Sequence, residues 1–330
     1  MDTFAPVAKL ATIRALFAIA AVEDLKIDQM NVVAAFLASD LDEYLFMEQP
    51  EGFQQGKERE DLVCLVQKSL YEFKQLARLW NQKLRRFLKK IGFYQLHFDH
   101  CVYINKDTSV ILAMWVDDLI LFAKSRLKVD KMKDQLRAEF EMKGLGSLRY
   151  FIGIRIQRDR EQGKLRIDQK GYIEMILQRF EMENSKPVAT PIATGTKLTK
   201  ATETDQIIDI KSYQSKIGSQ MYAMLCTRPD IAYAVSQVSQ FNASPTFTHD
   251  AVAQRVLQYL NGSMNLGIEY NEEEGLVLRM YVDADWGASE NRRSIGGFIA
   301  ILAGGAISWS CKKQGSVALS STEAEYMALV

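Results

Sequence analysis

Two adjacent aspartates interrupt a long apolar run, and this feature constrains the chain more than any other. Asp117 and Asp118 lie between residues 111–114 and 119–123, whose apolar side chains predict two strands joined in a hairpin. Two carboxylates within an apolar strand pair are costly to bury unless another group compensates their charge. A divalent cation compensates them well, because hard cations take carboxylate oxygens as ligands. The alternative is a solvated turn that carries two acids, and the spacing alone leaves both interpretations open.

Hydrophobic periodicity predicts further helices and strands along the chain. Apolar residues recur at helical spacing in residues 10–23, 76–93, 128–140, 172–180, 212–225, 230–241 and 248–262. Strands are predicted at residues 148–158 and within 25–37, where the strand runs into a helix start. The polar stretch 184–209 contains two prolines and predicts a loop or linker. From residue 276 the pattern changes to strands, the last of them at residues 316–320, before a final helix.

Length and charge limit the domain organisation and the class of partner. The 330 residues predict two or three domains, because one compact core rarely extends so far. Acidic and basic residues balance at 41 each, yet a basic channel and an acidic site would cancel in that sum, so a nucleic-acid binder is not excluded. The four cysteines form no CxxC pair and predict reduced thiols in an intracellular protein. The apolar N-terminal stretch is broken by Arg14 and has no basic leader, which argues against a signal peptide or a membrane span.

A series of sequence blocks resembles the Pol polyprotein of copia-type retrotransposons. The acidic pair stands in the block WVDD, which resembles the YVDD box of that family with Trp115 in place of tyrosine. Other blocks keep the family's order and rough spacing from residue 3 to residue 330: TFAPVAKLATIR, KSLYEFKQLARLWN, FEMKGLGSLRYFIGI, RPDIAYAVSQVSQF, DADW, RRS, GGAISW and LSSTEAEY. The resemblance implies a reverse transcriptase, which is an RNA-directed DNA polymerase, with an attached ribonuclease H domain.

The fold that this resemblance implies is of the α+β class and has several domains. Residues 1–183 would form the palm and thumb of a reverse transcriptase, with the fingers largely missing. Residues 184–275 would form a linker and a helical connection, and residues 276–330 the opening half of a ribonuclease H-like α/β fold. Because no fingers segment with its lysine and arginine precedes the TFAP block, we expect the nucleotide clamp to be absent.

The resemblance also implies the chemistry. Family members transfer nucleotides with two divalent ions per site, Mg²⁺ or Mn²⁺, which activate the primer 3′-hydroxyl and stabilise the leaving pyrophosphate. Asp117 and Asp118 are the implied metal ligands of the polymerase site. The implied partners are an RNA template, a DNA primer, an RNA/DNA hybrid and deoxynucleoside triphosphates, with no membrane. The implied location is intracellular, in a cytoplasmic virus-like particle or in the nucleus, and the oligomeric state is not indicated.

One catalytic position departs from the family pattern. The strand block of the family reads roughly QMDVKTAFL, and its aspartate is the third metal-binding carboxylate, whereas Asn31 stands there in this chain. We expect the loss of one formal charge to cost several kcal/mol in the transition state, on the order of 10³-fold in rate. Asp28 lies three residues earlier, and odd spacing on a strand places it on the opposite face, so we do not expect it to replace the lost charge. The Asn31 side chain should lie within about 4–7 Å of the Asp117 carboxylate.

A second block differs around the start of a helix. The family reads SLYGLKQAPRQWN, whereas here Glu72 replaces the glycine and Ala77 the proline. Lys74, Gln75 and Arg78 are retained, and the resemblance implies that they bind template or nucleotide. The alternative for these three side chains is a solvated helix start.

The C-terminal segment resembles the opening of a ribonuclease H fold. Asp283 on its first strand and Glu323 at the start of its helix are the implied metal ligands, with Asp285 as the alternative to Asp283. Arg292 and Arg293 are the implied nucleic-acid contacts. We expect three antiparallel strands with one helix across a face, which would bring Asp283 and Glu323 together. The chain stops before the remaining acidic ligands, so we do not expect a complete nuclease.

The role of Glu323 has a rival interpretation. Ser320 and Glu323 form a capping-box pattern, in which the glutamate would only complete the helix start. Thr322 and Glu325 form a second such pattern, so Glu325 could cap the helix and leave Glu323 free to face a metal.

Two hypotheses about function follow from these observations. The first is a reverse transcriptase with a partial ribonuclease H domain, working by two-metal nucleotidyl transfer and impaired in this copy. The second is a catalytically dead retrotransposon remnant that binds nucleic acid weakly at most. Mg²⁺-dependent extension of a DNA primer on an RNA template separates them.

Overall fold

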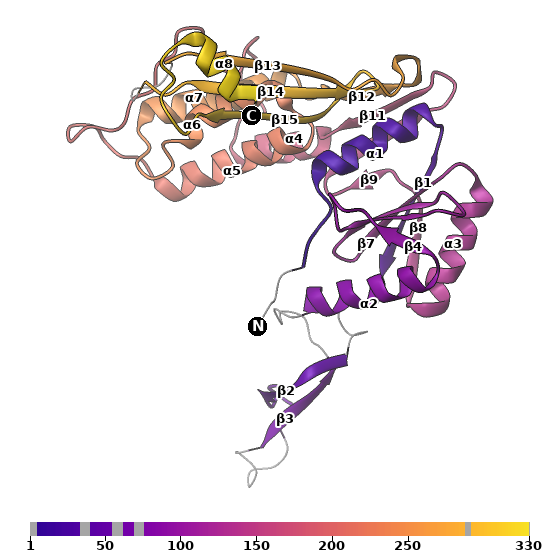
Figure 1. Ribbon diagram of the computed structural model, residues 1–330. Coiled ribbons are helices and arrows are strands. Elements are labelled where there is room, and N and C mark those ends of the chain that lie inside the picture. The colour runs from indigo at the N-terminus through magenta and orange to yellow at the C-terminus, as the bar shows by residue number, and fades with distance from the viewer. Residues whose placement is uncertain (1–4, 34–39, 55–61, 69–75, 288–291, 330) are drawn as a thin grey trace. The chain divides into compact units, whose positions relative to one another are not determined.

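The structure is a computed structural model that describes residues 5–33, 40–54, 62–68, 76–287 and 292–329. The chain divides into two units, both of mixed α and β structure (Figure 1). Unit 1 comprises Met1–Lys9 and Leu25–Leu148, and unit 2 comprises Leu10–Asp24 and Arg149–Val330. The three-part division predicted at residues 183 and 275 stays a prediction.

Unit 1 is built on an antiparallel sheet of six strands. Their order is β4 (Phe93–Gln95), β5 (Val102–Asn105), β6 (Ile111–Trp115), β7 (Asp118–Ala123), β1 (Lys26–Val32) and β8 (Met142–Ser147). Strand β7 lies centrally, and its residues 119–123 are fully buried on both faces. A separate pair is formed by β2 (Asp40–Glu48) and β3 (Val63–Lys68).

Two helices accompany the six-stranded sheet. Helix α2 (Leu76–Lys90) buries Trp80, Leu84 and Leu88, which recur every four residues and so share one side. Helix α3 (Arg126–Glu139) begins at the N-cap Ser125, whose hydroxyl accepts from the Lys128 backbone N–H. Both helices were predicted from apolar spacing, and both are confirmed.

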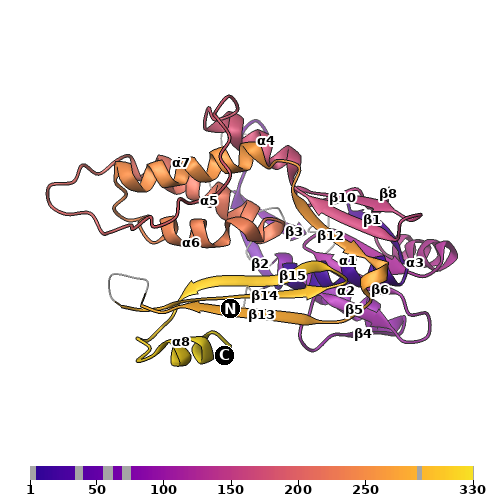
Figure 2. The same cartoon turned by 90° about the horizontal axis from the view of Figure 1, so that it is seen from above.

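Unit 2 contains two sheets and a group of helices (Figure 2). The first sheet has the order β12 (Gly267–Asn271), β11 (Lys164–Asp168), β10 (Ile154–Asp159) and β9 (Tyr150–Phe151). The second consists of β13 (Arg279–Asp285), β14 (Ile295–Leu302) and β15 (Gly305–Lys313). The helices are α1 (Leu10–Val22), α4 (Lys170–Arg179), α5 (Ile210–Cys226), α6 (Ala232–Ser239), α7 (Phe247–Gly262) and α8 (Ser321–Leu329), with short 3₁₀ turns η1 (Pro229–Ile231) and η2 (Glu272–Glu274).

Helix α1 belongs to unit 2 because Arg14 anchors it there. The Arg14 guanidinium is buried and donates to the backbone oxygens of Ile307 at 2.7 Å and Leu225 at 2.6 Å. It also stacks on the Trp309 ring, 3.9 Å from the ring centroid. Burial lowers the pKa of Arg14 to about 10. A lone arginine in an apolar helix gave no sign of this role.

Several predicted elements need correction. The strand expected at 148–158 is broken into β9 and β10, because Ile152 and Gly153 both have a positive φ, of 43° and 72°. Residues 316–320 form no strand, and the helix start expected after β1 falls on residues 34–39, outside the described residues. Sequence reasoning did not find β2, β3, β4, β8, β11 and β12. Within the part of the chain that the structure describes, no helix has the length and apolarity needed to cross a membrane.

Candidate active site

The acidic pair lies at the tip of the β6–β7 hairpin. Trp115 pairs with Asp118, so Val116 and Asp117 form a two-residue turn. Val116 has φ +56°, a left-handed conformation that is unusual for a β-branched residue and costs about 1–3 kcal/mol. The buried Trp80 of α2 donates its indole N–H to the Val116 carbonyl oxygen at 2.9 Å. The turn is therefore held from the helix side as well as by its own strands.

Strand β1 brings Asn31 to this tip across 86 positions of sequence. Asn31 pairs with Asp118 in the β1–β7 register, and the Val32 N–H donates to the Asp117 carbonyl oxygen at 3.1 Å. The Asn31 amide Nδ2 lies 3.2 Å from Asp117 Oδ2 and 3.3 Å from Asp118 Oδ1. The groups are closer than the 4–7 Å expected for ligands of one metal site, because the amide donates directly to the carboxylates.

A second amide joins this cluster. Gln29 Nε2 donates to Asp118 Oδ1 at 3.0 Å, and Gln29 shares the face of β1 that carries Asn31. Sequence reasoning missed Gln29, although its position two residues before Asn31 could have indicated it. Among the described residues, the hydrogen-bond donors that contact the two carboxylates are therefore neutral amides. An ionised aspartate at position 31 could not donate, and three carboxylates together would require a cation.

The oxygen atoms of Asp117, Asp118 and Asn31 could act as ligands of a divalent ion, with one negative charge fewer than in the family pattern. No group of three or more His, Cys, Asp or Glu that could hold a metal is found among the described residues. Mg²⁺ is nevertheless commonly held by one or two carboxylates, with substrate phosphates completing its shell. Asp117 and Asp118 meet that requirement, and the Asn31 amide would have to turn so that its oxygen faces the ion.

The opposite face of β1 carries a different charge cluster. The Asp28 carboxylate is fully buried and accepts from Arg126 Nη1 at 2.7 Å and from Lys133 Nζ. Burial alone would raise the pKa of Asp28, but the hydrogen bonds from these two cations outweigh it and hold that pKa below its usual value. Asp28 therefore faces away from Asn31, as the strand spacing predicted.

The predicted template contacts are only partly described. Lys74 and Gln75, like Glu72, lie outside the described residues. Arg78 is half-buried in the first turn of α2, two residues before the Trp80 that contacts the hairpin turn.

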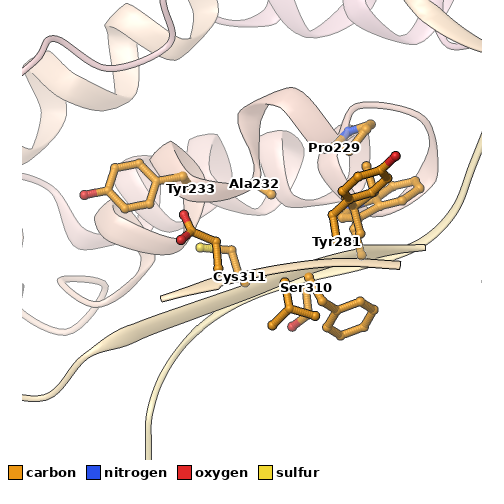
Figure 3. A pocket seen from close by; sticks show the side chains of 12 residues that line it. Pro229, Ala232, Tyr233, Tyr281, Ser310 and Cys311 are labelled. Carbon is orange, nitrogen blue, oxygen red and sulfur yellow. The ribbon is translucent and has the colours of Figure 1, made fainter. Parts of the chain in front are cut away.

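The predicted ligands of the C-terminal segment lie on different faces of its sheet. Asp283 pairs with Gly297, whereas a side chain at the neighbouring Gly296 would meet Ala328 of α8. Helix α8 therefore covers the face opposite to Asp283. The Asp283 face borders a hollow of about 290 Å³ beneath α6, and Figure 3 shows Tyr281 and Cys311 on the side of the strands that faces Tyr233.

Glu323 makes the contacts of a helix cap. Its carboxylate accepts from the Leu319 N–H at 2.6 Å, and its own N–H donates to the Ser320 hydroxyl at 3.1 Å. The capping glutamate is thus Glu323 and not Glu325, and the structure does not bring Glu323 and Asp283 together.

The remaining predicted residues of this segment lie at the end of β13 and in the chain that precedes β14. Asp285 is exposed at the end of β13. Arg292 borders a hollow of about 390 Å³ together with Trp286 and Leu319, and Arg293 follows it as a half-buried residue.

Comparison with known proteins identifies the family. Residues 1–194 match the family model of the reverse transcriptase (RNA-dependent DNA polymerase). The chain is 40% identical to the retrovirus-related Pol polyprotein from transposon TNT 1-94 of Nicotiana tabacum, over 99% of the chain and 25% of that protein. It is 38% identical to the Pol polyprotein from transposon RE2 of Arabidopsis thaliana, over 98% of the chain and 22% of that protein.

A third relative is of similar length to this chain. The putative transposon Ty5-1 protein of Saccharomyces cerevisiae is 34% identical, over 90% of the chain and 97% of that protein. The chain spans about a quarter of the length of the two Pol polyproteins. It belongs to the reverse transcriptase family and corresponds to the reverse transcriptase region of copia-type Pol polyproteins.

Proposed function

We propose that this chain is an RNA-directed DNA polymerase that extends a DNA primer on an RNA template from deoxynucleoside triphosphates. The observation that carries this proposal is the convergence of Asp117 and Asp118 with Asn31, which comes from a strand 86 positions earlier. Membership of the reverse transcriptase family, which generally uses divalent metals, supports it further.

Asp117 and Asp118 would hold the divalent ions, Mg²⁺ or Mn²⁺, two per site. Bound there, the ions would activate the primer 3′-hydroxyl and stabilise the leaving pyrophosphate. The residues of the chain supply the geometry: the hairpin turn presents both carboxylates, and the Trp80 indole fixes that turn. Gln29 restrains one oxygen of Asp118, so that the carboxylate is already oriented before substrate arrives.

Asn31 lowers the activity of this copy without removing the site. Its amide must give up two hydrogen bonds before an ion binds, and its oxygen carries no formal charge. We expect the Mg²⁺-dependent rate to be on the order of 10³-fold below that of a site with three carboxylates.

For residues 276–330 we propose a relation to ribonuclease H in which Asp283 and Glu323 are the inherited metal ligands. These two side chains lie on opposite faces and Glu323 caps α8, so this segment should cut no RNA/DNA hybrid as it stands. Metal-dependent cleavage of a labelled hybrid by the full chain would contradict this expectation.

The experiment that tests the polymerase proposal is single-nucleotide addition to a DNA primer annealed to RNA, with Mn²⁺. Mn²⁺ tolerates imperfect ligand sets better than Mg²⁺, so the wild type should add a nucleotide slowly. Asp118→Asn should abolish the addition. Asp134→Asn, which changes an exposed acid of α3, should leave the rate within a factor of about two. No addition by the wild type would favour a remnant with only weak nucleic-acid binding.

A further inference from the structure

Helix α2 carries a concentration of positive charge that the acidic hairpin does not use. Its sequence, LARLWNQKLRRFLKK, contains six basic residues and no acidic one. Trp80, Leu84 and Leu88 are buried on its inner side, so the charge gathers on the outer side. Four of its basic residues are exposed, and we call them the α2 basic face: Arg85, Arg86, Lys89 and Lys90.

Helix α3 of the same unit differs from α2, because acidic residues stand between its basic residues and pair with two of them. In α3, Arg126 pairs with Asp130, and Arg137 lies 3.6 Å from Asp134. Among the described residues, no member of the α2 basic face forms an ion pair. Like charges one turn apart destabilise a helix, so a helix without acids loses stability that α3 retains. An anionic partner would compensate that loss.

The position of the face relates it to the hairpin. Arg78, Arg85 and Lys89 are seven and four residues apart, so they lie along one side of the helix, over about 16 Å at a rise of about 1.5 Å per residue. The first turn of α2 is fixed at the hairpin by the Trp80 hydrogen bond to Val116. The row therefore begins in the same turn as Trp80, but it lies on the side of the helix opposite the hydrogen bond to the hairpin.

The side chains of α2 also restrict the kind of partner. Both of its aromatic rings, Trp80 and Phe87, pack edge-on against Phe140 at 5.2 Å, so neither is free to stack on a base. The apolar side of the helix is buried in the unit, so it cannot insert into a lipid surface. What remains is a row of cations suited to a regular array of phosphates.

We propose that the α2 basic face binds the sugar–phosphate backbone of a single-stranded nucleic acid, outside the acidic hairpin and without reading its bases. That the natural strand is RNA template rests on the proposed function, whereas binding to the backbone does not. The contact would hold the strand on unit 1 between additions of nucleotides.

The test measures binding without catalysis. Fluorescein-labelled oligouridylate and oligothymidylate are titrated with the full chain in EDTA, and anisotropy is followed at several salt concentrations. The Arg85→Gln/Lys89→Gln variant should bind roughly tenfold more weakly at low salt, and its slope of log affinity against log salt should fall by about 1.4, at about 0.7 per phosphate contact. Equal losses of affinity for oligouridylate and oligothymidylate would support binding to the backbone.

A matched control removes the same charge from α3. Lys131→Gln/Arg137→Gln changes two exposed cations of the same unit and should leave affinity within about twofold and the salt slope unchanged. Circular dichroism should show that both variants melt no earlier than the wild type. Unchanged affinity and salt slope for the oligonucleotides in Arg85→Gln/Lys89→Gln would overturn the proposal. Binding to phosphatidylserine vesicles is measured with the same variants, and a loss of binding seen only with these vesicles would also overturn it. This binding measurement contains no metal or nucleotide. Its result therefore holds even if the chain fails to extend a primer.

Discussion

On one face of β1 the buried carboxylate of Asp28 is held by two cations, whereas on the other face the Asn31 amide donates to two carboxylates. The first cluster is closed, because Arg126 and Lys133 belong to the chain and stay in place. In the second, the donors that the described part of the chain supplies are neutral amides, which a cation can displace. The same strand thus carries a permanent cluster of ion pairs on one face and, on the other, carboxylates whose neutral partners a cation could replace.

The two clusters should respond differently to the loss of a partner. Removing one member of a buried ion pair leaves an uncompensated charge and costs about 3–5 kcal/mol. A single hydrogen bond to a charged group contributes about 1.5–3 kcal/mol, and less where water can replace it. Stability measurements can therefore distinguish a structural carboxylate from a functional one.

The largest effect on stability is expected for Lys133→Met. Lys133 is buried against Asp28, and its removal should lower the free energy of unfolding by about 3 kcal/mol in urea denaturation, the lower end of that range, because Arg126 still pairs with Asp28. Lys131→Met, on the exposed side of the same helix, should change it by less than about 0.5 kcal/mol. Equal losses of stability in both variants would show that the pairing of Lys133 with Asp28 does not stabilise the fold.

A smaller loss is expected for Asn31→Asp in the absence of metal. This change removes two hydrogen-bond donors and adds a third carboxylate, so unfolding should become easier by about 1–3 kcal/mol. Mg²⁺ should then stabilise the variant by about 2.7 kcal/mol at a hundredfold excess over its dissociation constant, and the wild type by less. Identical thermal shifts in both proteins would show that position 31 lies outside a metal site.

The smallest expected effect is on the pH dependence of the unfolding free energy, to which Asp28 contributes. The pKa of Asp28 is lower in the folded chain than in the unfolded one, so its contribution is complete above about pH 4 and is lost as pH falls through the folded value. The difference in unfolding free energy between the wild type and Asp28→Asn should therefore narrow below about pH 4. A constant difference down to pH 2 would contradict the low pKa.

The sequence predicted the parts that local pattern controls. The hairpin, α2 and α3 follow from apolar runs and helical spacing, and the position of Asn31 beside Asp117 followed from the family resemblance. Strands β8 and β12 were missed because neither contains a continuous apolar run, and β8 contains two glycines among its six residues. Their pairing depends on partners distant in sequence, which periodicity does not record.

Roles that depend on tertiary contacts were also out of reach. Nothing in the segment 10–22 indicates that Arg14 reaches Ile307, nearly the whole chain away. The choice between Glu323 and Glu325 as the helix cap depended on one hydrogen bond to Leu319. Asp283 and α8 lie on opposite faces of the sheet because Gly296 faces the helix, whereas Gly297 pairs with Asp283. The sequence does not indicate which of these two glycines faces the helix.

The central claim is that the acidic hairpin is a polymerase metal site in which Asn31 stands where a third carboxylate belongs. The most direct test is the Mg²⁺-dependent rate of single-nucleotide addition by the wild type, Asn31→Asp, and Asn31→Asp combined with Asp118→Asn. We predict that Asn31→Asp is faster than the wild type by on the order of 10³-fold, and that the added Asp118→Asn change abolishes this gain. An Asn31→Asp variant no faster than the wild type, or a gain that survives the loss of Asp118, would contradict the account.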